Sequence, residues 1–351
     1  MNAQFGLPLS FGVLIFSFII TSLLIVPFID FLYHHKLIRK KEAPVRGRIP
    51  LFDKLHDKKA GTPVGAGILI IIVVSVIFLF LFPFASRMGV FIKSSFNFRD
   101  EVFVMFFTLI SFGLLGLSDD LIKIFGKPRK GNLGMWVGLG RRQKFIIQWI
   151  LGLFIGLFLY LRLGIHILHI PLLGSVIDLG FWYVPFAAFI IVSFTNAFNI
   201  TDGLDGLSSG LLVICLGAFA SLAASSLDTP LSLFIMIWIG ALIAYLYFNV
   251  WPARVILGDT GALAFGAMLA VIGLLTGALV ALTVIGGIFL IELASSAIQI
   301  VHWKLFKRPL FPLAPLHHTF LAKGWEEPKI VVRAWLAGIM LSILGLWLAT
   351  I

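Results

Sequence analysis

Ten long apolar stretches follow one another along this chain, and they restrict its fold more than any other feature. A helix that crosses a bilayer needs about 20 apolar residues. Stretches of this kind lie near 8–33, 64–86, 101–118, 145–163, 180–198, 207–226, 230–248, 260–278, 282–303 and 331–350. Hydrophobic residues make up 60% of the chain and charged ones 12%, a balance foreign to soluble globular proteins. The sequence predicts an all-α polytopic membrane protein of about ten transmembrane helices, organised as a single domain over residues 1–351.

Lys and Arg divide unevenly between the two sides of these helices. One side receives the loops 34–63, 119–144, 199–206, 249–259 and 304–330. With Arg333 at their border, these loops hold 23 of the 27 Lys and Arg residues. Because cytoplasmic loops carry the excess of basic residues, we expect this side to face the cytoplasm and both termini to face outward. The same bias accounts for the net charge of +11 without a nucleic-acid partner.

Acidic residues gather on this same predicted cytoplasmic side. Charges beside membrane spans are costly and usually functional. The sidedness rests on Lys and Arg alone, so the position of the acids supports a site there independently. The acids in question are Asp119, Asp120, Asp202, Asp205 and Asp259.

The segment GLSDDLIKIFGK places Asp119 and Asp120 side by side at the end of a predicted span. Adjacent carboxylates repel each other unless a cation joins them, which favours a Mg²⁺ partner. On a helix, Asp119 and Lys123 share a face. An ordinary ion pair at a helix end is the alternative explanation.

A second polar group occupies the segment SFTNAFNITDGLDGLSSG. Asn196, Asn199, Asp202 and Asp205 follow one another at intervals of three residues. Such oxygen ligands suit Mg²⁺ or the polar edges of a nucleotide, and the intervening glycines let the backbone approach a ligand. One aspartate could instead cap the following helix, but a cap does not explain four polar groups.

The segment YFNVWPARVILGDTGALAFG adds Asn249 at the end of one span and Asp259 at the start of the next. A helix N-terminus with nearby glycines favours anions and phosphates. A cap of this helix by its own Asp259 or Thr260 explains the same pattern equally well.

Two basic segments offer further contacts to phosphate. In PLAPLHHTF, His317 and His318 suit phosphate contact or proton handling better than a zinc site, because the only cysteine, Cys215, lies inside a span. A solvated loop is the alternative for this segment. The segment HDKKAGTPVGAG is not a Walker A loop, and its basic residues also fit the positive-inside rule. It supplies Lys58, Lys59 and Thr62.

One predicted span carries a polar stripe. Glu292, Ser296 and Gln299 share a face of the span 282–303. We expect these side chains to make hydrogen bonds between transmembrane helices.

Carboxylates, amides, histidines and lysines thus converge at one membrane face, in front of apolar walls. Such a site suits the joining of a water-soluble phosphorylated substrate to a lipid one. Mg²⁺ would neutralise a diphosphate and lysines would hold the lipid phosphate, since phosphoryl transfer depends mostly on positioning and charge stabilisation.

The segments SDDLIK, NAFNITDGLDGL, YFNVWPARVILGDTGALAFG and APLHHTFLAKGWEEPKIVVRAW make the chain resemble the polyprenyl-phosphate N-acetylhexosamine-1-phosphate transferases, from about Lys58 to the C-terminus. HDKKAGTP, the KGWEEPKIVVRAW tail and the stripe at 292–299 are similar to the muramoyl-pentapeptide branch. The resemblance implies a homodimer in the bacterial inner (plasma) membrane, with the active site on the cytoplasmic face. It also implies that undecaprenyl phosphate attacks the β-phosphorus of UDP-MurNAc-pentapeptide, releasing UMP and forming lipid I with Mg²⁺ as cofactor.

The resemblance also implies roles for individual residues. Asp119 activates or orients the lipid phosphate, and Asp259 binds Mg²⁺ together with Asn199 or Asp120. The catalytic group is Asp119, Asp120, Asp259 and His317. The substrate-binding group is Lys58, Lys59, Thr62, Lys123, Asn196, Asp202, Asp205, Asn249 and His318.

Three positions depart from the pattern of the muramoyl branch. Thr319 stands in place of a third histidine, Leu321 in place of a glutamate and Ile256 in place of a phenylalanine. These changes leave UDP-N-acetylglucosamine or a related sugar nucleotide as an alternative donor, and a catalytically inactive relative as another alternative. An anion transporter is the alternative from a different class, and it would place ionisable residues along a path through the membrane.

Overall fold

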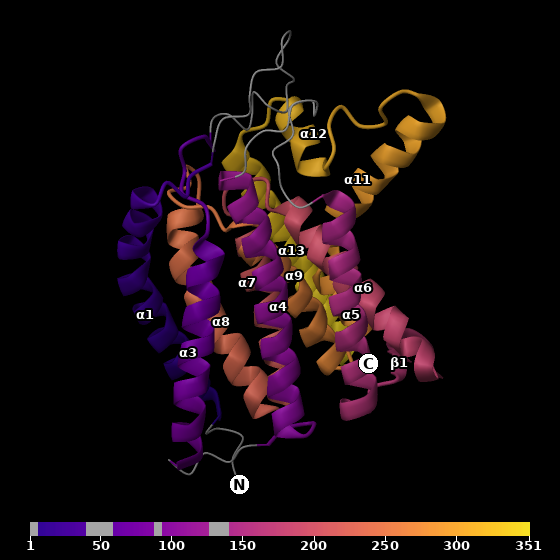
Figure 1. Cartoon of the computed structure of the whole chain (residues 1–351). Helices are drawn as coiled ribbons and strands as arrows, with labels where there is room; N and C mark the ends of the chain where they lie inside the picture. Colours follow the sequence, from indigo (N-terminus) through magenta and orange to yellow (C-terminus); the bar gives the residue numbers. More distant parts are fainter. Residues whose placement is uncertain (1–5, 40–58, 88–92, 126–139) are drawn as a thin grey trace.

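The computed structural model describes residues 6–39, 59–87, 93–125 and 140–351 (Figure 1). Within these ranges, ten helices are long and apolar enough to cross a membrane, which confirms the predicted number of spans. The ten are α1 (Gly6–His34), α3 (Ala66–Arg87), α4 (Phe98–Phe125), α5 (Arg141–Leu163), α6 (Tyr183–Thr201), α7 (Leu207–Ser225), α8 (Thr229–Asn249), α9 (Gly258–Leu275), α11 (Gly287–Phe306) and α13 (Glu327–Ala349). They form one bundle, with α12 (Leu316–Ala322) at one end and the C-terminus towards the other (Figure 1).

The prediction of an all-α chain is wrong between α5 and α6. Strands β1 (Ile167–Ile170) and β2 (Ser175–Asp178) form an antiparallel pair in which Ile167 lies opposite Asp178. The short 3₁₀ helix η2 (Pro171–Leu173) connects them, and η3 (Gly180–Trp182) follows. Exposed and half-buried residues alternate along β1, because successive side chains of a strand point to opposite faces.

The predicted span 282–303 also has different bounds. A short helix, α10 (Leu279–Ile285), comes first, and α11 begins only at Gly287. Gly286 lies between them against Phe194, where an added Cβ would sit 2.5 Å from the ring. The break lets α10 pack against α13 while α11 packs against α6, and the far end of α11 projects from the bundle (Figure 1).

Helix α9 is the central helix of the bundle, and its residues are buried almost throughout. Glycines allow its backbone to touch three neighbours directly. A Cβ on Gly67 of α3 would press on the backbone of Gly261, one on Gly116 of α4 on Thr260, and one on Gly266 on Phe194 of α6. Small residues of this kind permit close helix contacts in membranes. They fix the start of α9 beside the last turns of α4.

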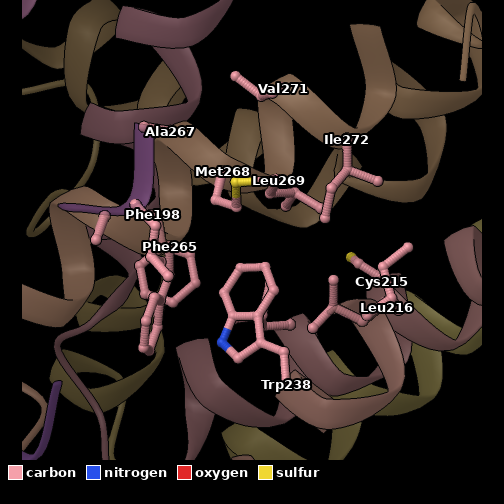
Figure 2. Close-up of a cluster of buried hydrophobic side chains, with 14 of the residues drawn as sticks. Phe198, Cys215, Leu216, Trp238, Phe265, Ala267, Met268, Leu269, Val271 and Ile272 are labelled. Atoms are coloured by element: carbon pink, nitrogen blue, oxygen red, sulfur yellow. The ribbon is translucent and has the colours of Figure 1, made fainter. Parts of the chain in front are cut away.

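A cluster of aromatic and aliphatic side chains fills the space between α7, α8 and α9 (Figure 2). Trp238 lies at its centre, with its ring centroid 5.1 Å from that of Phe265. Phe265 in turn meets Phe198 of α6 edge to face. Cys215 is buried in the same region. This core holds the interior helices whose ends carry the polar residues.

Candidate active site

Helix α4 caps helix α9 through Asp120. Its Oδ1 accepts the backbone N–H of Asp259 at 2.9 Å, and its Oδ2 accepts the backbone N–H of Thr260 at 2.9 Å and the Thr260 hydroxyl at 2.7 Å. The carboxylate therefore occupies the N-terminus of α9, where backbone donors and the helix dipole favour a negative charge. The alternative that Asp259 or Thr260 caps this helix is wrong, because the cap comes from α4.

Asp119 and Asp259 lie between two lysines. Lys123 Nζ is 3.0 Å from Asp119 Oδ2 and 2.8 Å from Asp259 Oδ2, which confirms that Asp119 and Lys123 share a face of α4. Lys144, at the start of α5, is 2.9 Å from Asp119 Oδ2 and also pairs with Asp259. Asp119 is 3% exposed and Asp259 16% exposed. We call these four residues the acid–lysine cluster.

A second network holds the loop between α6 and α7. Lys59 Nζ is 2.7 Å from Asp205 Oδ1 and 2.6 Å from Glu327 Oε1, and it donates to the carbonyl of Gly203 at 3.1 Å. Glu327 Oε1 also accepts the backbone N–H of Asp205, and Asp205 Oδ2 accepts that of Ala253 at 2.9 Å. The three ionic side chains are mostly buried. They tie the segment around Lys59, the α6–α7 loop and the start of α13 together.

Asn249 and Asp202 hold the other edge of this loop. Asn249 Oδ1 accepts from the Gly206 backbone and the Ser209 hydroxyl, while its Nδ2 donates to the carbonyl of Val255 at 3.0 Å. Asp202 ends α6 and accepts the Ser208 hydroxyl at 2.5 Å. Helix α7 starts at Leu207 after Gly206 with no side-chain cap, so the alternative that an aspartate caps this helix is wrong.

The environment of Asp202 links the loop to the acid–lysine cluster. Burial raises the pKa of the Asp202 carboxyl to about 6, against the lowering effects of the Ser208 hydrogen bond and the Lys59 charge. The charges of Asp259 and Asp205 also raise this pKa. Asp202 therefore lies within electrostatic range of Asp259.

The two asparagines of α6 differ in their surroundings. Asn196 Nδ2 donates to Gln148 Oε1 of α5 at 2.7 Å and to the carbonyl of Val192 at 2.8 Å. Asn199, one turn nearer the loop, is half-buried, and its side chain makes no hydrogen bond to other described residues. Its amide is therefore not committed to another described residue, whereas Asn196 joins α5 to α6.

The histidines and the polar stripe of α11 meet at α12. His317 and His318 are both buried, with ring centroids 4.2 Å apart, and His317 Nδ1 lies 3.1 Å from Glu292 Oε2. Gln299 bonds the backbone of Leu310 and Phe311. The prediction that the stripe joins transmembrane helices is wrong. Glu292 and Gln299 instead anchor α12 and the loop that leads to it, and the Ser296 hydroxyl has no partner among the described residues.

For the remaining residues singled out in the sequence, the structure gives little information about a role in the site. Thr62 is half-buried, and its backbone carbonyl accepts from Arg39 at 2.9 Å. Lys58 lies outside the described residues. Thr319 donates its hydroxyl to the carbonyl of Leu313, so the residue that replaces the third histidine has a structural hydrogen bond. The backbone of Ile256 pairs with Pro63, Gly65 and Ala66.

Three residues of this region were missed by sequence reasoning, namely Lys144, Gln148 and Glu327. Lys144 has the same appearance as any basic residue before a span, and Gln148 lies inside an apolar run. Glu327 follows Glu326 at the start of a span, a common position for acids at a helix N-terminus. Only their contacts in the folded chain identify these three residues as part of the site.

The carboxylates can be tested as ligands for the predicted Mg²⁺. No group of three or more His, Cys, Asp or Glu side chains is arranged to hold a metal ion in the described ranges. Mg²⁺, however, commonly uses one or two protein carboxylates and completes its shell with phosphate oxygens and water. Asp259 and Asn199 offer oxygen atoms of the kind that Mg²⁺ uses, but two lysine ammonium groups already pair with the Asp259 carboxylate, so a metal ion would have to displace them.

Comparison with known proteins gives the class first. Residues 102–277 match the family model of glycosyl transferase family 4, so the bundle is a membrane-embedded transferase of this class. Three similar proteins carry the name Phospho-N-acetylmuramoyl-pentapeptide-transferase. The one from Geobacillus sp. (strain WCH70) is 37% identical over 338 residues, 95% of this chain and 96% of the relative. That from Geobacillus thermodenitrificans is 37% identical (95% of each chain), and that from Bacillus subtilis is 35% identical (94% of each). The chain therefore belongs to the phospho-N-acetylmuramoyl-pentapeptide-transferase family, which confirms the resemblance drawn from its motifs.

Proposed function

We propose that this protein transfers phospho-N-acetylmuramoyl-pentapeptide from UDP-MurNAc-pentapeptide to undecaprenyl phosphate, giving lipid I and UMP. The observation that carries the proposal is the acid–lysine cluster, because two lysines held by two carboxylates can take up phosphate groups at the end of a membrane bundle. The similarity to the named relatives over about 95% of the chain supports it.

In this reaction the residues of the site have separate roles. Lys123 and Lys144 exchange their carboxylate partners for phosphate oxygens of the two substrates, and Asp119 between them orients the attacking lipid phosphate. The α6–α7 loop with Asp202 and Asp205, held by Lys59 and Asn249, forms the side of the site that takes the sugar nucleotide. His317 and His318 complete this side of the site. Asp119, Asp259 and Lys144 are mostly buried, which strengthens the charge interactions between them.

We propose Mg²⁺ as the cofactor, with Asp259 and Asn199 as its protein ligands. Bound Mg²⁺ would neutralise charge on the diphosphate. Asp120 positions Asp259 by capping α9. Both of its oxygens already accept hydrogen bonds, and its role as a metal ligand stays a prediction. Removal of divalent cations with EDTA should abolish turnover, and added Mg²⁺ should restore it. Full activity in EDTA would contradict the assignment.

Incubation of the purified protein with undecaprenyl phosphate and a panel of UDP-sugars tests the function. We expect release of UMP from UDP-MurNAc-pentapeptide and loss of this release in Asp259→Ala. Release only from UDP-N-acetylglucosamine would instead select the alternative donor that Thr319, Leu321 and Ile256 leave open. Uptake of an anion into proteoliposomes without UMP release would select the transporter, and no activity with any donor would select the inactive relative.

The site should lie on the cytoplasmic face of the inner membrane, with both termini outside. The unequal distribution of Lys and Arg supports this orientation. The only cysteine, Cys215, is buried, so single cysteines can be introduced as reporters at the exposed positions Lys323 and Arg162. In intact cells, a membrane-impermeant maleimide should label Arg162→Cys and spare Lys323→Cys. The reverse pattern would invert the topology.

We also propose a homodimer, which the resemblance to the transferase superfamily implies. Light scattering of the protein in detergent, corrected for bound detergent, should give twice the chain mass of 38.7 kDa. A single-chain mass across the working concentration range would refute it.

A further inference from the structure

A buried glutamate–histidine pair joins α11 to α12. Glu292 Oε2 lies 3.1 Å from His317 Nδ1 and 3.3 Å from the backbone nitrogen of His317. The side chains are 8% and 1% exposed. The same Glu292 oxygen accepts the backbone N–H of His317, and an ionised carboxylate only accepts hydrogen bonds, so we assign the hydrogen of this pair to Nδ1. The partner of one ring nitrogen thereby decides what the other can do.

The other ring nitrogen, Nε2, is buried and has no hydrogen-bond partner among the described residues. It lies against Gly203, where an added Cβ would be 2.5 Å from it. Gly203 belongs to the α6–α7 loop, and its carbonyl accepts from Lys59. A buried polar atom without a partner costs about 1–3 kcal/mol, so its presence beside a candidate site calls for a functional explanation.

The acids on the two elements that contact the His317 ring favour a hydrogen-bond donor of the ligand over a phosphate oxygen. Asp202 and Asp205 flank Gly203 on the loop side, with Lys59 paired to Asp205, and Glu292 lies on the α11 side. A neutral ring with hydrogen on Nδ1 presents a lone pair at Nε2. That lone pair accepts from a hydroxyl or an N–H group.

We propose that Glu292 is a positioning residue of the donor site, which holds His317 in the Nδ1–H tautomer so that Nε2 accepts a hydrogen bond from a hydroxyl or N–H of the sugar nucleotide. The identity of this ligand rests on the proposed function, whereas the pair itself rests on the geometry above. Gly203 has no side chain over Nε2, so a small shift of its peptide opens the nitrogen to the ligand.

The first test measures the tautomer without any substrate. Nitrogen-15 solid-state NMR of ring-labelled histidine in lipid bilayers distinguishes Nδ1–H from Nε2–H. The signal that disappears in His317→Asn is assigned to His317. Glu292→Gln keeps an acceptor for Nδ1 and should keep the Nδ1–H signal, whereas Glu292→Met should lose it. Ser295→Ala is the matched control, because Ser295 accepts the backbone N–H of Leu316 and so anchors α12 without touching the ring. It should keep the signal.

The second test measures UMP release from UDP-MurNAc-pentapeptide. Glu292→Met should lower kcat/KM for this donor about tenfold, as expected for one lost hydrogen bond, and leave the KM for undecaprenyl phosphate unchanged. Glu292→Gln should stay within about threefold of the wild type. The double variant Glu292→Met/His317→Asn should be no worse than His317→Asn alone, because Glu292 acts through the ring.

An unchanged Nδ1–H signal in Glu292→Met would overturn the inference, as would losses that multiply in the double variant. If the wild type fails to use this donor, the proposed function falls, while the NMR measurement still decides whether Glu292 sets the tautomer of His317.

Discussion

The contact of Gly116 with the start of α9 allows a sharp test of how the acid–lysine cluster is positioned. A Cβ added at Gly116 would lie 2.6 Å from Thr260 Cα and closer still to the backbone carbonyl of Asp259, whereas ordinary contacts begin at 3.4 Å. These are backbone atoms that cannot rotate away. In Gly116→Ala, α4 and α9 must therefore separate by about 1 Å, a misplacement that can cost about 100-fold in rate.

We expect Gly116→Ala to lower kcat/KM for UMP release about 100-fold and to lower stability by about 1–3 kcal/mol, the usual cost of overpacking. The matched control is Gly113→Ala, one turn earlier on the same helix. There the nearest atom is the end of the Ile71 side chain, at 2.9 Å, and it can move. Both changes replace a helical glycine by alanine, so the gain in helix propensity cancels between them.

Steady-state kinetics and thermal unfolding in the same detergent measure both effects. Wild-type kcat/KM in Gly116→Ala would refute the argument that backbone contact sets the distance between the carboxylates. An equal loss in Gly113→Ala would show that the effect does not come from this contact.

Three further changes test single interactions. Asp120→Ala removes the cap of α9 and should cost about 0.5–2 kcal/mol, seen as a lower unfolding temperature together with lower activity; an unchanged unfolding temperature would deny the capping role. Lys144→Met should raise the KM for the UDP-sugar about tenfold or more by removing one charge-assisted contact to phosphate, and Lys144→Arg should recover part of it, whereas equal KM values in all three proteins would exclude Lys144 from the site. Asp202 has its pKa raised from 3.8 to about 6 by burial, so the folded state holds this proton more tightly than the unfolded state and stability should fall as pH rises through that interval. Asp202→Asn should flatten the unfolding temperature between about pH 4 and pH 6; parallel profiles for the two proteins would contradict the assignment.

Much of the fold could be predicted from the sequence, because hydropathy is a local property. A run of about 20 apolar residues is long enough to cross a bilayer wherever it occurs, so the ten spans are found without knowledge of their neighbours. The short hairpin at 167–178 was missed because four-residue strands give little periodic signal. The break at Gly286 was missed because it depends on the contact with Phe194.

The sequence by itself determined the transmembrane nature of this protein, the motifs that carry Asp119, Asp202 and Asp259, and the family that those motifs identify. Only the tertiary structure decided that Asp120 caps α9 and that Lys144 completes the acid–lysine cluster. The reason is physical: the length and apolarity of a span depend on neighbouring residues in the chain, whereas the partner of a carboxylate depends on which helices pack together. Asp120 and Thr260 are 140 positions apart in the chain and hydrogen-bonded at 2.7 Å in space, and Gly116 of α4 permits this close approach of the two helices.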